Sequence, residues 1–195
     1  MHELILSNIA KHISLDESEV AFFISLLKVK RVSKKDTVLQ NGQVCKEINF
    51  VKSGMLRAYY ADEMGKESTI MFAISDWWIT DMYCFANELP AMVNIVAMED
   101  SVVFSLSKQD MEKLLTTIPK FERYFRLLMQ NAYIREQLRI IQNLSQSAEE
   151  RYQYFRAKYP QVAKQVTQKQ IASYLGITPE FLSKLRRKQN VKLES

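Results

Sequence analysis

The chain has 195 residues, of which 47% are apolar and 25% charged, and its net charge is +5. This length allows one or two domains, and the composition is typical of an ordinary globular protein. No stretch approaches the ~20 apolar residues of a transmembrane helix, and the first residues lack the pattern of a signal peptide, so we expect a cytoplasmic location and no membrane partner.

Residues 1–28 are predicted to be helical, because Asp16 precedes an apolar run and Glu19 follows three residues later, as in a capping box. Residues 29–117 contain seven short segments rich in β-branched and aromatic residues, separated by turn signals such as "QNGQ" and "DEMGK". Strands at this near-regular spacing predict a sandwich or a β-roll.

The predicted roll lacks the residues that most enzymes of this shape need. Both histidines, His2 and His12, precede it, so no imidazole lies there for a metal site or a Ser-His-Asp set. Two cysteines, Cys45 and Cys84, are too few for a disulfide framework or an iron–sulfur cluster, and we expect buried thiols. We therefore predict no enzyme, no metal and no cofactor. The two carboxylates after the fifth segment are expected in turns or caps: Asp76 and Asp81.

Residues 119–145 change to a helical period, and Pro119 suits a first helical position. One set of side chains follows the alternating 3-4 spacing of a heptad seam. The seam contains Tyr124, Leu127, Asn131, Ile134, Leu138 and Ile141. A second apolar set, on another face, contains Phe121, Phe125, Leu128 and Ala132. Such a helix can pack on its own β-domain and on a partner helix, so we predict a homodimer through the seam. The alternative is one wide intramolecular face.

Positive charge is concentrated toward the C-terminus. Residues 1–119 contain 12 basic and 16 acidic side chains, whereas residues 120–195 contain 15 and 6. This distribution favours a polyanion-binding C-terminal part, for which nucleic acid is the common partner. The alternative is a solvated basic face.

The stretch "VTQKQIASYLGITPEFLSKLRRK" has the spacing of a DNA-binding helix-turn-helix. Gly176 permits the left-handed conformation that ends a helix, and Thr178 and Pro179 suit the start of the next one. The matching positions are Ile171, Ala172, Leu175, Gly176, Ile177, Leu182 and Leu185. A short helix with Ser147 as N-cap and Glu150 at the capping-box position is predicted before this motif. We predict double-stranded DNA as the ligand, the alternative being a plain structural corner.

The second helix of this motif should direct its polar side chains outward, toward base edges and phosphates. The predicted DNA-contacting residues are Thr167, Gln168, Lys169, Thr178, Pro179, Glu180, Ser183, Lys184, Arg186, Arg187 and Lys188.

The order of parts resembles the cyclic-AMP receptor protein / fumarate-and-nitrate regulator (Crp/Fnr) family of bacterial transcription factors. "FVKSGMLRAYY" resembles the family's central hairpin, "ISDWWITD" its approach to the ligand cassette, and "IVAMEDSVVFSLSKQDMEKLL" its last roll strands and following helix. The resemblance implies an α+β fold. Its parts would be a cyclic-nucleotide-binding-like β-roll (double-stranded β-helix) over 1–118, a dimerisation helix over 119–145 and a helix-turn-helix domain over 146–195.

The same resemblance implies a homodimer that binds a palindromic operator and is biased by something in the roll. RNA polymerase and an unidentified small-molecule effector are further partners that it allows. The alternative function is a roll that binds a small apolar ligand or a partner protein without reading DNA.

The chain departs from the family's nucleotide-binding pattern. The Gly-Glu pair that holds the ribose is replaced by Ile79 and Thr80, and the phosphate-binding arginine falls near Pro90 or Ala91. No Arg or Lys occurs between Lys66 and Lys108. Because a buried phosphate needs a cation or a set of donors, we expect no binding of cyclic AMP.

The cassette is instead aromatic and apolar, which allows an apolar effector, although these side chains can equally fill the roll. The effector-pocket candidates are Trp77, Trp78, Ile79, Thr80, Met82, Tyr83 and Ala91.

The recognition helix departs from the family as well. Pro179 stands at the family's first contact position, usually an arginine, whereas Glu180 matches the family's glutamate and Lys184 its second arginine position. Glutamate can accept from cytosine and lysine can reach guanine, so the operator should differ from the family's usual half-site. The stretch "QNVKLES" is too short for the family's two-stranded wing.

Overall fold

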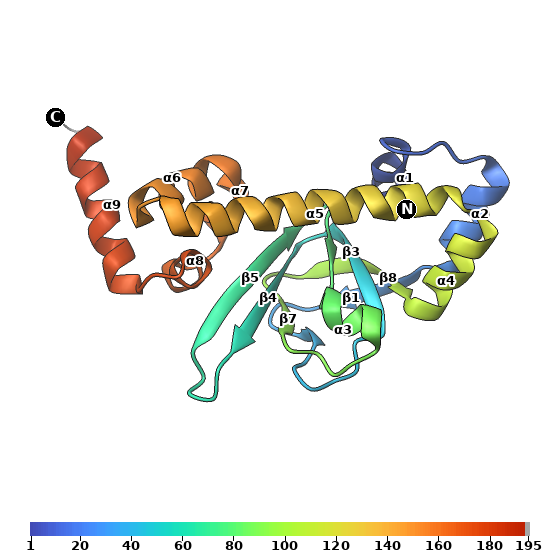
Figure 1. Ribbon diagram of the computed structural model, residues 1–195, viewed down its shortest axis with the longest axis horizontal. Coiled ribbons are helices and arrows are strands. Elements are labelled where there is room, and N and C mark those ends of the chain that lie inside the picture. Colours follow the sequence, from blue (N-terminus) through green and yellow to red (C-terminus); the bar gives the residue numbers. More distant parts are fainter. Residues whose placement is uncertain (194–195) are drawn as a thin grey trace. The chain divides into compact units, whose positions relative to one another are not determined.

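The computed structural model describes the backbone of residues 1–193 and the side chains of residues 1–187. It has the predicted α+β architecture (Figure 1). The strands are β1 (Lys28–Val32), β2 (Thr37–Leu39), β3 (Glu47–Ser53), β4 (Met55–Ala61), β5 (Glu67–Ile74), β6 (Trp78–Ile79), β7 (Asn94–Ala97) and β8 (Ser101–Ser107). The helices are α1 (Glu3–Ala10), α2 (Glu17–Leu26), α3 (Met82–Asn87), α4 (Lys108–Thr117), α5 (Lys120–Ser145), α6 (Ala148–Lys158), α7 (Pro160–Gln165), α8 (Gln168–Leu175) and α9 (Pro179–Leu193).

The chain forms two compact units. The first contains residues 1–58 and 72–134, and the second contains residues 59–71 and the chain from Arg135 onward. The division therefore passes through helix α5 and through the hairpin of β4 and β5. The predicted domain boundaries, after residues 118 and 145, follow the chain order and stay a prediction. No helix among the described residues combines the length and hydropathy that crossing a membrane requires.

The strands form two four-stranded sheets, in the orders β1-β8-β3-β6 and β2-β7-β4-β5. In the first sheet, Phe50 on β3 lies opposite Phe104 on β8 and Trp78 on β6. All seven predicted segments are strands, and the predicted sandwich or roll is confirmed. The short elements β6, α3 and α7 had no prediction, because two to six residues carry too little periodicity to be recognised.

The core of the first unit is built from the sheets and from helices that meet the N-terminal part of α5. Phe121 on α5 stacks on Phe23 of α2, with ring centroids 5.0 Å apart, and both side chains are fully buried. Burial of one such side chain contributes about 1.5–3 kcal/mol. Figure 1 shows α1, α2 and α4 gathered around this end of α5.

A polar network crosses this core at Tyr124 of α5. Its buried hydroxyl donates to Asn8 Oδ1 (2.7 Å) and accepts from Trp78 Nε1 (2.9 Å). Asn8 Nδ2 in turn donates to Asp76 Oδ1 at 2.9 Å. Burial raises the pKa of Tyr124 well above its ordinary value, so the hydroxyl keeps the proton that it donates. The network therefore links α1, β6 and α5. Within it, the Tyr124 hydroxyl both donates and accepts a hydrogen bond.

The predicted caps are present. Asp16 and Glu19 form a capping box at α2, and the backbone amide of Glu19 lowers the pKa of the Asp16 carboxyl. Ser147 and Glu150 form another at α6. The two roll carboxylates also lie where we predicted. Asp81 caps α3, and Asp76 lies in a turn with a left-handed backbone, φ 75°.

Both cysteines, Cys45 and Cys84, are free and buried, as predicted. Burial raises the pKa of the Cys84 thiol. Cys45 Sγ lies 3.1 Å from Thr80 Oγ1, so this thiol also has a polar neighbour within the first unit.

The turn between β3 and β4 requires glycine. Gly54 has a φ of +91°, and a Cβ built there would lie 2.2 Å from Ser101 Oγ and 2.8 Å from Ser101 Cα. The Ser101 hydroxyl also accepts from the Met55 backbone amide, at 3.2 Å. The turn between β3 and β4 thus lies against the first residue of β8 at a position that has no space for a side chain.

Replacement of Gly54 by alanine is expected to destabilise the first unit by about 2–4 kcal/mol, because backbone strain and a clash with Ser101 act together. Gly42→Ala is the matched control, since Gly42 also has a positive φ (+85°) but a Cβ added to it would meet nothing within 4 Å. Its cost should be about 1 kcal/mol. Urea denaturation followed by tryptophan emission measures both, because Trp77 and Trp78 lie in the first unit. Equal costs for the two variants would contradict the close contact.

Candidate nucleic-acid interface

Helices α8 and α9 form a tightly capped helical pair within the second unit. Thr167 caps α8: its Oγ1 accepts from the Gln170 amide, and its own amide donates to Gln170 Oε1 at 2.9 Å. The Thr167 hydroxyl also donates to Gln170 Oε1, at 3.0 Å. Thr167, which we predicted to contact DNA, therefore uses its hydroxyl to start the helix.

The turn between the helices has the predicted conformation. Gly176 is left-handed, with φ 69° and ψ 31°, and the amide of Ile177 donates to the carbonyl of Ala172 at 3.0 Å. Thr178 Oγ1 then accepts from the Phe181 amide at 3.2 Å, and Pro179 is the first residue of α9. The reversal is complete within three residues, which leaves the first turn of α9 at the surface.

The inner sides of the two helices pack as predicted. Ala172 and Leu182 are fully buried, and the remaining apolar positions are buried except for half-buried Ile177. The buried set contains Ile171, Ala172, Leu175, Leu182 and Leu185. Because a helix turns by about 100° per residue, these two leucines place Glu180, Lys184 and Arg187 on the opposite side of α9. We call these three residues the α9 stripe, and all three are exposed.

The other predicted contact residues flank the α9 stripe. Ser183 donates a hydrogen bond to Gln168 Oε1 (3.1 Å), which ties α9 to the start of α8. The exposed residues are Gln168, Lys169, Thr178 and Arg186, and Pro179 is half-buried. The side chain of Lys188 lies outside the described residues. The backbone up to Leu193 continues α9, so these residues do not form a wing strand.

Sequence reasoning missed three side chains at this surface. Phe181, in the first turn of α9, is 45% exposed, and an apolar side chain there can contact a thymine methyl group. Arg156 and Lys164 share a hollow of about 490 Å³ with Arg186 and Gln168. In the sequence, only the general basic charge indicates Arg156 and Lys164, because residues of four different helices, α6 to α9, form the hollow.

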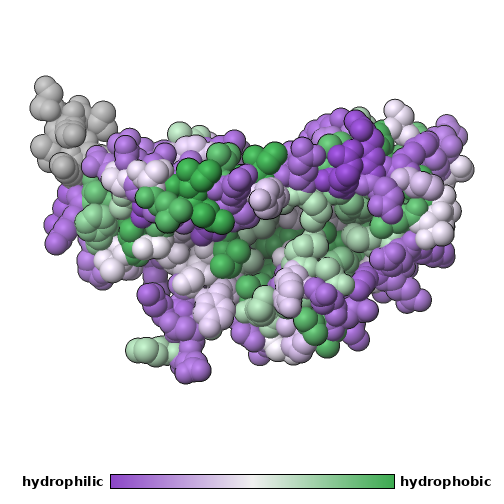
Figure 2. All heavy atoms as spheres, in the orientation of Figure 1, coloured by the Kyte–Doolittle hydropathy of each residue, from purple (hydrophilic) through white to green (hydrophobic). Residues whose placement is uncertain are grey.

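Exposed apolar side chains continue along the C-terminal half of α5. Leu138, Ile141 and Ile134, from the predicted seam, are 48%, 50% and 44% exposed. A second exposed row lies beside them on the helix surface, given about 100° per residue. This row contains Tyr133, Ile140 and Leu144. Figure 2 shows hydrophobic side chains gathered along this part of α5.

The predicted seam is wrong at its first residue. Tyr124 is fully buried and hydrogen-bonded within the first unit, so its side chain is not available to a partner chain. Leu127 is half-buried, and Asn131 is exposed. The reason is that the 3-4 spacing marks an apolar row without indicating whether its own chain already covers that row.

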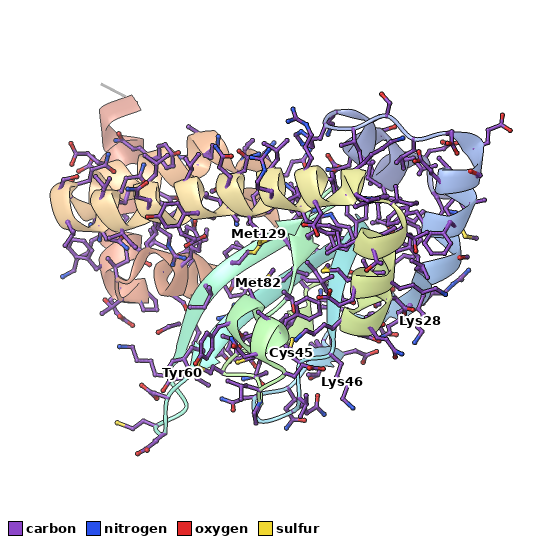
Figure 3. All side chains as sticks on the ribbon, turned by 45° about the vertical axis from the view of Figure 1, so that its right-hand side comes forward. Lys28, Cys45, Lys46, Tyr60, Met82 and Met129 are labelled. Carbon is purple, nitrogen blue, oxygen red and sulfur yellow. The ribbon has the colours of Figure 1, made fainter. Side chains whose placement is uncertain are left out.

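The effector-pocket candidates differ in exposure, and their role stays a prediction. Ile79 and Ala91 are buried, whereas Met82 and Tyr83 are exposed on α3, where Figure 3 labels Met82. The Thr80 hydroxyl donates to the Glu47 carbonyl at 2.9 Å. Trp77 is half-buried.

Trp78 packs edge-on against Phe50 and Phe125, with ring centroids 5.3 and 5.9 Å away. This packing favours a core role for Trp78 over a ligand-binding one.

Comparisons with known proteins agree with this arrangement. Residues 29–117 match the family model described as a cyclic nucleotide-binding domain. Electron transport regulator A of Shewanella oneidensis is 23% identical over 94% of this chain and 78% of its own. Regulatory protein HlyX of Actinobacillus pleuropneumoniae is 24% identical over 92% of this chain and 79% of its own. A solved transcriptional regulator of the Crp/Fnr family from Eubacterium rectale has a TM-score of 0.73 at 20% identity, covering 91% of this chain and 85% of that one.

The chain thus resembles a Crp/Fnr regulator in fold along nearly its whole length, and residues 29–117 form a domain of the cyclic nucleotide-binding type. The similarity to these regulators and the helix-turn-helix of α8 and α9 both favour a DNA-binding role. The fold class predicted from the resemblance is confirmed as well.

Cations are unevenly distributed in the roll. The cassette stretch after β5 contains neither Arg nor Lys as far as Lys108. Among the described residues, the buried cation is Arg57, at 4% exposure, and it comes from β4 instead. Arg57 precedes the cassette in the sequence, so the cassette pattern does not indicate it.

Two substitutions on α9 should separate base reading from phosphate binding. Glu180→Ala should lower discrimination at one base pair by about 1–3 kcal/mol. Non-specific affinity should stay the same or rise, because a negative charge is removed. Arg187→Ala should weaken all duplexes alike and lower the salt slope by about 1.

Titrations of matched and mismatched duplexes across a salt series measure both effects. Arg31→Ala is the charge-matched control, because Arg31 is an exposed residue of β1 in the first unit, and it should change neither quantity. An equal loss of matched and mismatched affinity in Glu180→Ala would show that this residue does not read a base.

Proposed function

We propose that this regulator binds a palindromic operator as a homodimer through its two α9 helices, and that it does so without a cyclic nucleotide. The observation that carries the proposal is the α9 stripe, Glu180, Lys184 and Arg187, opposite the buried Leu182 and Leu185. This placement directs three charged side chains to one outward face behind a rigid turn. Such a face supports docking of the helix N-terminus in a major groove.

The exposed apolar rows of α5 support the homodimer. Leu138 and Ile141 are each about half exposed, and they continue the 3-4 spacing from Ile134. Apolar rows of this length are uncommon on a monomer surface, and the same spacing on a second copy would cover them as in a coiled coil. Two-fold symmetry then presents two α9 helices to half-sites about one helical turn apart.

The charges of the α9 stripe define the kind of operator that we propose. Glu180 is placed to accept from a cytosine amino group, and Lys184 to donate to guanine as a point charge. Pro179 has no side-chain donor, and its ring forms the start of α9. The half-site should therefore differ at the base pair that the family's arginine normally reads.

Other parts of the proposal follow from the similarity to Crp/Fnr regulators. We propose a cytoplasmic location, RNA polymerase as a further partner, and a small-molecule effector as a ligand of the roll. We propose no enzymatic activity, since Asp76 and Asp81 serve as turn and cap residues. The alternative, a roll that binds an apolar ligand or a partner protein without reading DNA, would leave the α9 stripe without a use.

Selection of bound duplexes from a random pool tests the operator and the dimer together. The unaltered chain should enrich a palindrome. The double variant Leu138→Glu/Ile141→Glu should be monomeric and enrich none, because two charges would lie in the paired seam. Sedimentation velocity reports the oligomeric state of each protein.

The control for this variant is Asn143→Asp, which adds a negative charge on the same helix about half a turn from the seam. Asn143 is exposed, and the control protein should remain dimeric and enrich the same palindrome. A double variant that stays dimeric would place the dimer interface elsewhere, and a pool without any enriched sequence would overturn the proposed DNA reading.

Calorimetry should detect no binding of cyclic AMP or cyclic GMP, because the cassette supplies no cation for the phosphate. A simple one-site curve with micromolar affinity would contradict this prediction. In that case Arg57, buried on β4, is the cation to replace, and Arg57→Gln should abolish the binding.

A further inference from the structure

The tip of the β4–β5 hairpin belongs to the same compact unit as the helix-turn-helix. Residues 59–71 cluster with the chain from Arg135 onward. Their contact with α8 is made through Ser173, which lies on the first helix of the motif. The Thr69 amide donates to Ser173 Oγ at 2.8 Å, and the Ser173 hydroxyl donates to the Glu67 carbonyl at 2.7 Å.

A third bond completes the environment of Ser173. Thr69 Oγ1 lies 3.0 Å from Ser173 Oγ. Since the single Ser173 hydroxyl proton is donated to Glu67, Thr69 must be the donor in this bond. Ser173 therefore donates once and accepts twice, and Thr69 is 1% exposed. Loss of the Ser173 hydroxyl would leave a buried amide without this acceptor.

Arg139 on α5 forms hydrogen bonds with the same two elements, the β4–β5 hairpin and α8. Its Nη1 donates to the Ile70 carbonyl at 2.6 Å, and its Nη2 donates to the carbonyls of Thr69 (3.0 Å) and Tyr174 (3.1 Å). Its guanidinium also lies over the Tyr174 ring, 4.3 Å from the centroid. One planar cation thus joins the hairpin to α8 through two nitrogens, whereas the donors of a lysine all share one nitrogen.

The carbonyls involved lie at the end of α8, directly before the turn to α9. Tyr174 accepts from Arg139, and Leu175 accepts from Arg151 Nη2 at 3.4 Å. Cations at the last carbonyls of a helix interact favourably with its dipole. The position of Gly176, and with it the start of α9, is therefore fixed by arginines from α5 and α6.

We propose that Arg139 and Ser173 are positioning residues that couple the β4–β5 hairpin to DNA reading. This inference rests on the proposed function. Strands β4 and β5 continue from the sheet of the roll into the tip that holds α8. A change in the roll that shifts this hairpin therefore shifts α8 and α9 with it. We call the hydrogen bonds that Arg139 and Ser173 make between the hairpin and α8 the tether. In a dimer, the tether sets the separation of the two recognition helices and hence the half-site spacing that fits.

The test compares Ser173→Ala with Ser173→Thr, which keeps the hydroxyl, and Arg139→Lys with Lys158→Ala. Lys158 is an exposed residue at the end of α6. Arg139→Lys keeps the positive charge, and Lys158→Ala shows what the loss of a surface cation alone does in the same unit. Two quantities are measured on the full chain: amide hydrogen exchange over residues 67–71, and affinity for the selected operator with its half-sites moved apart by single base pairs.

Ser173→Ala and Arg139→Lys should speed exchange at the hairpin about fivefold or more, the effect of losing one or two hydrogen bonds. They should also weaken binding at the preferred spacing about tenfold and flatten the dependence on spacing. Ser173→Thr and Lys158→Ala should retain the spacing preference, and all four proteins should stay dimeric.

Faster exchange with an unchanged spacing preference would overturn the proposal, since the tether would then be structural only. Tighter binding in Ser173→Ala would also overturn it, because the tether would then restrain the reading helix. Failure of the proposed function is a distinct result, in which the unaltered chain selects no operator.

Discussion

Helix α5 must bury apolar side chains in two different ways along its 26 residues, and the other parts of the molecule depend on how it does so. Near its start, Phe121 and Tyr124 are inserted among the side chains of α1, α2 and the roll. Beyond Ile134, its leucines and isoleucines lose that cover and remain exposed, while Arg139 reaches the hairpin and α8. A helix buried throughout by its own chain would have no surface for a second copy. A helix exposed throughout would have no fixed place on its own roll.

The role of the basic C-terminal part of the chain depends more on the arrangement of its charged side chains than on its net charge. A solvated basic face would give the same net charge without any order in its cations. Here the buried Leu182 and Leu185 determine which side of α9 faces outward, and the caps at Thr167 and Thr178 determine where each helix begins. Apolar packing therefore decides which charges can enter a groove. The phosphates then add affinity without adding sequence preference.

Much of this could be predicted from local patterns. Gly176, Thr178 and Pro179 have backbone requirements that few residue types satisfy, and strands of alternating aromatic and β-branched residues are easily recognised. The predictions failed where the role of a side chain depended on which other residues cover it or bind to it. Tyr124 fits a heptad spacing, but the same spacing describes a row covered by its own chain. Arg139 and Ser173 bind mainly to backbone carbonyls and amides, which nearly every residue has. No pattern of side chains in the sequence therefore indicates these contacts.

The environment of the two cysteines has a practical consequence for measuring motion in this protein. Cys45 and Cys84 are each 1% exposed, and burial raises the pKa of the Cys84 thiol, so little thiolate is available for alkylation. A cysteine introduced on an exposed face of α9 would therefore be the reactive thiol of the folded chain. Spin labels attached there in both copies of a dimer would give the separation of the two reading helices directly, with the native residues of the roll left untouched.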